Sequence, residues 1–152
     1  MSAWQRLVPA VLAVLAVATT ASCSDQNAAA TSNRGQEPAT VVQIGRSGLH
    51  RITLTPDGAR RIALATGTVT LAKAGGAPML RVPAAAVFYR PDGSTWVYAR
   101  TARLTFERAR VVLARVVGSA AELRSGPPVG TVVVTVGVAE LRGAEDGVPG
   151  EQ

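Results

Sequence analysis

The sequence predicts a mainly β protein, built as a small β-roll or barrel-like domain with one short helix. Valine is abundant after residue 80, and β-branched residues favour strands. In the same region short apolar runs stand between turn-forming residues, a pattern typical of strands joined by turns. Hydrophobic residues make up 47% of the chain but aromatic residues only 4%, so we expect a core of Val, Leu and Ala.

The chain of 152 residues has room for one small domain and its linking segments. Residues 24–40 are small and polar without apolar periodicity, which predicts a flexible tether. We therefore expect four regions: an export signal at 1–22, a tether at 23–40, a β-domain at 41–142 and a disordered polar tail at 143–152.

The N-terminal region carries one charge, Arg6, followed by an uncharged, mostly apolar stretch at 7–18. This stretch is too short for a transmembrane helix, which needs about 20 apolar residues, and its length is typical of an export signal. Either an ordinary signal peptidase cuts near Ala21 and leaves a free thiol, or Cys23, the only cysteine, receives lipid. The second interpretation explains the lone cysteine and is favoured, although Thr20 replaces the leucine usual in such signals. The region resembles a bacterial lipoprotein signal, which implies a lipid anchor at Cys23 on the extracytoplasmic (periplasmic) side of the membrane.

The first half of the β-domain predicts a strand at 49–54 and then a short helix at 56–65. Thr55 is a candidate N-cap, Pro56 suits the first helical position, and Asp57 favours the positive end of the helix dipole. Gly67 ends this helix. A short strand at 68–72 and a loop at 73–78 follow.

The second half predicts strands and turns alone. We expect a hairpin between 81–90 and 96–100 around the turn at 91–93, with Pro83 marking an edge or a bend. Trp96 and Tyr98 should lie on one face of their strand and Val97 on the other. Further strands are expected at 104–117, with a bend near Ala109, at 122–124, and at 131–136, the most buried strand.

The side chains give a net charge of +6, and Lys73 is the only cationic residue that is not arginine. An exported chain with so few aromatic residues is not expected to bind nucleic acid. The densest cationic cluster is either a solvated strand face or a surface for lipid headgroups or a partner, where each residue contributes about 1 kcal/mol. Its members are Arg100, Arg103, Arg108, Arg110 and Arg115, opposed in sequence only by Glu107.

No pattern of catalytic or metal-binding residues stands out. His50 is the only histidine and has no cysteine or carboxylate at ligand spacing, and Met79 is isolated. The serines have no base within reach by sequence pattern. We therefore expect no enzyme activity, no metal site and no cofactor.

Six stretches in fixed order resemble the C-terminal, membrane-proximal domain of periplasmic adaptors, also called membrane fusion proteins, of resistance-nodulation-division efflux pumps. They are VPAAAV at 82–87, DGSTWVY at 92–98, FERARV at 106–111, ELRSG at 122–126, GTVVVTVG at 130–137 and EL at 140–141. Upstream, ITLTPDGARRI at 52–62 resembles the strand and short helix near the start of some adaptors of this family. The resemblance covers residues 49–142.

Full adaptors insert a lipoyl-like domain, usually an α-hairpin, and a β-barrel before the Val82-Pro83 strand, whereas this chain has about a dozen residues there. The resemblance thus implies a lipid-anchored accessory subunit that docks on a transporter permease close to the membrane. It leaves a homo-oligomer open, since full adaptors assemble as rings. The alternative is a stand-alone cell-envelope lipoprotein that binds a small ligand or an envelope polymer.

Overall fold

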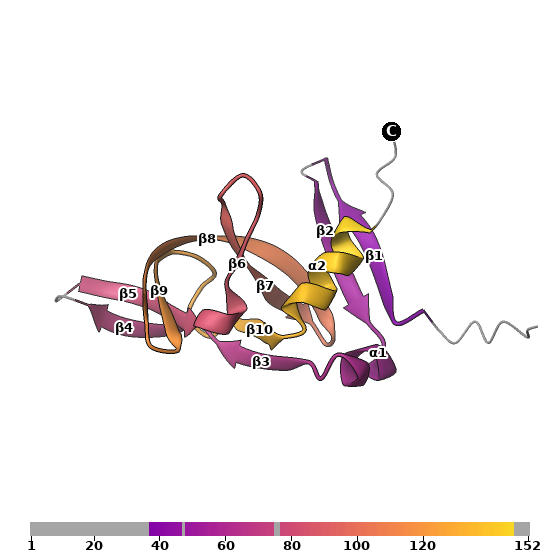
Figure 1. The fold of residues 1–152 in the computed structure, drawn as a ribbon, viewed down its shortest axis with the longest axis horizontal. Coiled ribbons are helices and arrows are strands. Elements are labelled where there is room, and N and C mark those ends of the chain that lie inside the picture. Colours follow the sequence, from indigo (N-terminus) through magenta and orange to yellow (C-terminus); the bar gives the residue numbers. More distant parts are fainter. Residues whose placement is uncertain (1–36, 47, 75–76, 148–152) are drawn as a thin grey trace, which may run out of the picture. The chain divides into compact units, whose positions relative to one another are not determined.

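The computed structural model describes residues 37–46, 48–74 and 77–147, and these form a mainly β domain as predicted (Figure 1). One sheet contains ten strands, and two short α-helices and a 3-10 turn accompany it. The predicted short helix is present, and a second short helix follows the last strand. In chain order the elements are β1 (Ala39–Ile44), β2 (Leu49–Leu54), α1 (Pro56–Arg61), β3 (Ala65–Thr68), β4 (Thr70–Ala74), β5 (Ala77–Pro83), η1 (Ala84–Ala86), β6 (Phe88–Tyr89), β7 (Thr95–Ala102), β8 (Thr105–Val117), β9 (Ala120–Ser125), β10 (Val132–Val136) and α2 (Val138–Asp146).

The sheet curls, and its two edge strands, β3 and β4, follow each other directly in the chain. The strand order is β3-β10-β7-β8-β9-β5-β4, and only Val69 separates β3 from β4. Val69 is fully buried and bonded on both sides: its N–H donates to Thr131 O at 2.9 Å, and its C=O accepts from Gly130 N at 2.8 Å. The β1–β2 hairpin joins this sheet through β8, and β6 joins it through β7.

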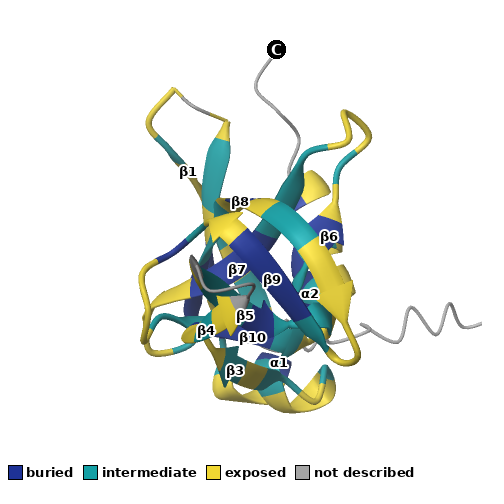
Figure 2. Ribbon diagram, turned by 90° about the vertical axis from the view of Figure 1, so that its left-hand side faces the viewer, coloured by how far each residue is buried: buried dark blue, intermediate teal, exposed yellow. Residues whose placement is uncertain are grey.

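Both faces of the central strands are buried, which produces two hydrophobic cores (Figure 2). Consecutive strand residues point to opposite faces, and Val133 and Val134 of β10 are both fully buried. The prediction that β10 is the most buried strand is wrong, because Val136 is exposed and β9 has three buried residues to its two. The assignment of Val97 and Tyr98 to opposite faces is confirmed. The first core contains Val69, Val82, Ala86, Val97, Val111, Ala121, Leu123 and Val133, and the second contains Ile52, Leu54, Phe88, Tyr98, Phe106, Val134 and Leu141.

Helix α1 begins as predicted and ends four residues earlier than expected. The Thr55 hydroxyl accepts a hydrogen bond from Gly58 N at 3.0 Å, and Pro56 occupies the first turn. The helix ends at Arg61 because Ala63 adopts a left-handed φ of 47°, which turns the chain into β3.

The segment at 77–90 differs from the predicted hairpin. Strand β5 ends at Pro83 and pairs with β4 and β9, and only Phe88 and Tyr89 pair with β7. Pro83 marks a bend, as expected, because the chain turns into η1 directly after it. The predicted loop at 73–78 is mostly strand, since β4 runs to Ala74 and β5 starts at Ala77.

The domain also extends beyond both predicted boundaries. Strand β1 starts at Ala39, two residues inside the expected tether, and α2 continues to Asp146, inside the expected tail. Helix α2 starts after Gly137, whose φ of 95° turns the chain out of β10. Most of its nine residues favour helix, but a helix this short is marginal alone, and burial of Leu141 and Glu145, one turn apart, stabilises it.

Candidate docking surface

The described residues contain no group of three or more His, Cys, Asp or Glu side chains that could hold a metal ion. No helix in residues 37–46, 48–74 and 77–147 is long and apolar enough to span a membrane. Cys23, the predicted lipidation site, lies outside the described residues. The remaining candidates for a functional site are the arginine cluster and the surface around α2.

The structure separates the five predicted arginines into two kinds. Arg100 and Arg103 are exposed around the turn from β7 to β8, Arg110 is exposed further along β8, and none of these three forms an ion pair within the part of the chain that is described. Arg108 and Arg115 are bound to carboxylates instead. The sequence neighbour Glu107 neutralises neither of them, because it pairs with Arg51 at 2.7 Å.

Arg108 is held inside the fold by a buried carboxylate of α2. Its side chain is 10% exposed, and Nη1 lies 3.1 Å from Oε1 of Glu145, which is 2% exposed. The guanidinium also donates to the backbone oxygen of Gly48 and lies 5.0 Å from the ring centre of Trp96. Arg108 is thus a structural residue, and its assignment to a contact surface is wrong.

Glu145 connects α2 to three strands. Tyr98 of β7 donates its hydroxyl proton to Oε2 at 2.7 Å, and Nδ1 of His50 on β2 lies 3.3 Å from Oε1. Burial, and then the hydrogen bond to Glu145, raises the pKa of Tyr98 far above its ordinary value. The phenol therefore stays a neutral donor, and His50 belongs to this structural cluster.

A second buried carboxylate, Glu122 of β9, is shared by two arginines. Arg81 lies 2.9 Å from it and Arg115 lies 2.7 Å from it, one on each neighbouring strand. These hydrogen bonds hold the pKa of Glu122 below its ordinary value. One carboxylate between two guanidiniums leaves one excess positive charge here, and Arg115 remains more than half exposed.

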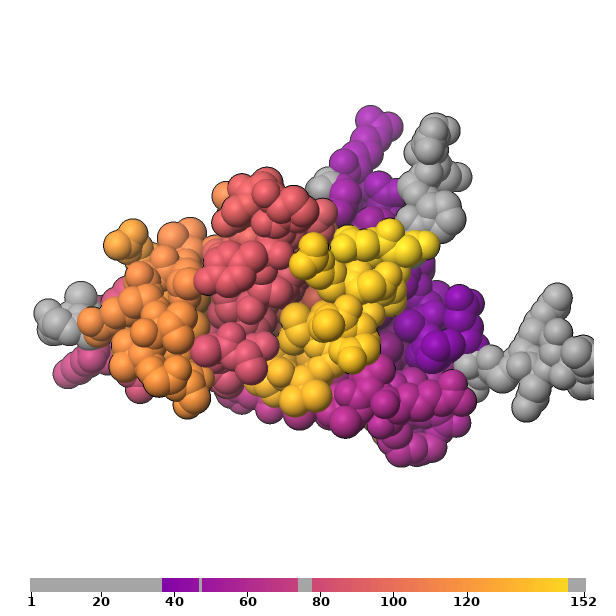
Figure 3. Space-filling view, in the orientation of Figure 1, coloured from indigo at the N-terminus to yellow at the C-terminus, as the bar shows by residue number. Residues whose placement is uncertain are grey.

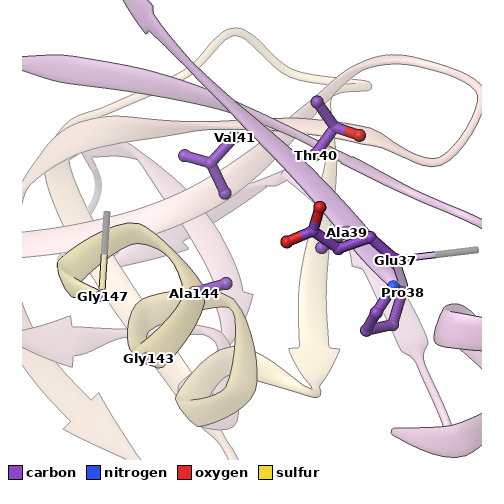
Figure 4. Close-up of a pocket in the computed structure, with 8 residues that line it drawn as sticks. All are labelled: Glu37, Pro38, Ala39, Thr40, Val41, Gly143, Ala144 and Gly147. Atoms are coloured by element: carbon purple, nitrogen blue, oxygen red, sulfur yellow. The ribbon is translucent and has the colours of Figure 1, made fainter. Parts of the chain in front are cut away.

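A groove of about 440 Å³ lies between β1 and α2 (Figure 4). Figure 3 shows α2 on the surface beside the indigo and purple atoms of β1 and β2. Small side chains line the groove, and the first and last described residues, Glu37 and Gly147, both belong to it. The remaining lining residues are Pro38, Ala39, Thr40, Val41, Gly143 and Ala144.

Few local signals in the sequence point to the two buried carboxylates. Glu145 lies in a stretch with two glycines that predicts a polar tail, and its spacing of four from Leu141 is a weak signal over one helical turn. Glu122 lies between the buried residues Ala121 and Leu123, and this position within an apolar run is a signal that could have identified it as a buried, paired carboxylate.

Comparison with known proteins gives limited results. No family model and no curated protein matches the sequence. Among solved structures, the fold is similar to the NMR structure of a 180-residue fragment with the N-terminal metal-binding site and the membrane-proximal domain of SilB from Cupriavidus metallidurans CH34. The identity is 21% and the TM-score 0.43, and the match covers 63% of this chain and 60% of that one.

Proposed function

We propose that this chain is a lipid-anchored, non-enzymatic, adaptor-like accessory subunit of a membrane efflux transporter, and that it acts by docking near the membrane. The observation that supports it most is the way the upstream stretch at 52–62 combines with the six later ones. Strand β2, which contains the start of the upstream stretch, pairs with β8, which contains the stretch at 106–111. These stretches resemble parts of one adaptor domain, and here they share one sheet.

The β4–β5 hairpin takes the place at which full adaptors carry their additional domains. It pairs with β9 and continues the sheet, so the shortened connection is part of the fold. A chain of this kind keeps the membrane-proximal part of an adaptor. Its contact surface would then be the exposed arginines Arg100, Arg103 and Arg110, which can meet anionic headgroups or acidic loops of a permease.

The anchor is tested by fractionating cells that produce the full chain or its Cys23→Ala variant. Two or three acyl chains hold a protein stably, since each buried CH₂ contributes about 0.8 kcal/mol. We expect the wild-type chain in the membrane fraction and the variant in the soluble fraction. A variant that stays with the membrane contradicts lipid anchoring at Cys23.

The partner is tested by purifying the tagged full chain in mild detergent and identifying a co-purifying permease. Replacement of Arg100, Arg103 and Arg110 by Gln removes about 1 kcal/mol per residue and should weaken capture about a hundredfold. The matched control replaces three other exposed arginines, Arg46, Arg61 and Arg124, by Gln. Absence of any permease refutes the adaptor role in favour of a stand-alone envelope lipoprotein. Equal losses in both variants refute the assigned surface.

A further inference from the structure

Within residues 37–46, 48–74 and 77–147, strand β1 lies at an edge of the sheet. It pairs only with β2 among the described strands, and all six of its residues pair without a bulge. Thr55 N donates to Pro38 O at 3.0 Å, so the pair 38/55 is of the hydrogen-bonded type. Because such pairs alternate along an antiparallel ladder, Thr40 and Val42 bond to β2, and the N–H and C=O groups of Ala39, Val41 and Gln43 point outward.

Natural edge strands usually carry charge, proline, a bulge or very short length, and these features prevent pairing with another chain. The other edges here have such features. The β3 ladder is bulged, β4 carries Lys73, and β6 has two residues. Strand β1 has the sequence ATVVQI, with no charged residue and no proline, and its Val42 is 56% exposed.

We propose that β1 is a self-association edge, on which β1 of a second copy of this chain pairs antiparallel around Val41. A twofold axis requires one residue to lie opposite itself, and outward hydrogen bonding restricts that residue to Ala39, Val41 or Gln43. Only the arrangement centred on Val41 uses all three outward residues. It pairs Ala39 with Gln43, Val41 with Val41 and Gln43 with Ala39, and each pair exchanges two hydrogen bonds.

The side chains fit this register. Val41 faces its own copy, and Thr40 faces Val42, so β-branched residues meet and no like charges lie opposite each other within β1. Ala39 and Val41 point to the face on which α2 lies, and they line the groove in Figure 4. The groove of about 440 Å³ leaves room beside the edge for Val41 of the second copy, next to Gly143 and Ala144.

Disulfide trapping in the full chain tests the register. Residues of a hydrogen-bonded antiparallel pair have Cα atoms about 5.5 Å apart, within the range that a disulfide bridges. A Val41→Cys variant should therefore form a covalent dimer under mild oxidation in membranes. Val42→Cys is the matched control, since Val42 lies two residues out of register with its own copy, about 8 Å away. The wild-type chain gives the background from Cys23.

A dimer band in Val41→Cys that exceeds both Val42→Cys and wild type supports the proposal. Equal bands in the two variants, or none in Val41→Cys, overturn it. A crosslink from Val41→Cys to a different protein also overturns it, in favour of a partner strand at this edge. Circular dichroism of both variants checks that they are folded.

A second measurement uses proline at an outward position. Gln43→Pro removes only an outward N–H, so it leaves the β1–β2 ladder intact. Two of the six interchain bonds are lost, each contributing about a factor of five, so self-association should weaken about thirtyfold in sedimentation equilibrium of the detergent-solubilised full chain. Gln43→Thr keeps the N–H and should associate like wild type. Equal association of Gln43→Pro and Gln43→Thr refutes pairing through this edge.

Discussion

The buried carboxylate of Glu145 should hold α2 in place, and Glu145→Gln tests this directly. Removal of the charge leaves the 10%-exposed guanidinium of Arg108 without its ionic partner and presents an amide N–H₂ to other donors. Breaking a buried pair in this way costs about 3–5 kcal/mol. Arg108 keeps its bond to Gly48 O and its contact with Trp96, so we expect the lower end, about 3 kcal/mol.

A described domain of about 110 residues has an unfolding entropy near 0.23 kcal/mol/K, so this loss lowers Tm by about 13 °C. Thermal and urea unfolding, followed by circular dichroism, measure it. The matched control is Glu140→Gln, on the exposed first turn of the same helix, which should change stability by less than about 1 kcal/mol. If Glu145→Gln stays within 1 kcal/mol of wild type, or if its effect adds fully to that of Arg108→Gln, the two groups are not coupled.

Three further predictions concern single residues. Gly58→Ala should destabilise by more than about 2 kcal/mol, although helix propensity alone favours Ala by about 1, because the added Cβ would overlap the carbonyl oxygen of Pro38; a stabilised variant in urea unfolding refutes this contact. Because the pKa of Tyr98 is raised in the folded state, its contribution to stability is fully present below pH 10 and is lost as the pH rises further and the phenol of the unfolded chain ionises. Tyr98→Phe should therefore show a smaller decrease in urea midpoint at alkaline pH. Because the pKa of Glu122 is lowered in the folded state, this carboxylate stabilises the fold above pH 4.5, and the contribution is lost as the pH falls through the lowered pKa. The difference in urea midpoint between wild type and Glu122→Gln should therefore shrink towards about pH 3. A difference that does not change with pH contradicts this prediction.

The parts of the fold that could be predicted from the sequence are those specified by local signals. Thr55, Pro56 and Asp57 marked the start of α1 through capping chemistry, and the valine run marked β10. The alternation of residues around Val97 correctly placed Val97 on one face of β7, and Trp96 and Tyr98 on the other. Each face packs in a different hydrophobic core.

The parts that failed depend on contacts between residues far apart in the chain. The expected hairpin at 81–100 looked local, but β5 pairs with β9, where Val82 and Leu123 share one core and Arg81 reaches Glu122. Helix α2 has no capping side chain, and it depends on the burial of Leu141 and Glu145 against the sheet. The arginine cluster likewise could not be divided into buried and exposed members from the sequence, because the burial of Arg108 depends on its ion pair with the distant Glu145.

The shared groove that Glu37 and Gly147 line has a consequence for rearranging the chain. Because the two ends of the described fold lie beside one pocket, a short linker could join them, and new termini could be opened at the tip between β4 and β5. Such a circular permutant would keep every strand pairing while moving the attachment point to the other end of the sheet. It would also place any tethered partner next to β4 instead of β1, so the same domain could be presented to a membrane in either orientation.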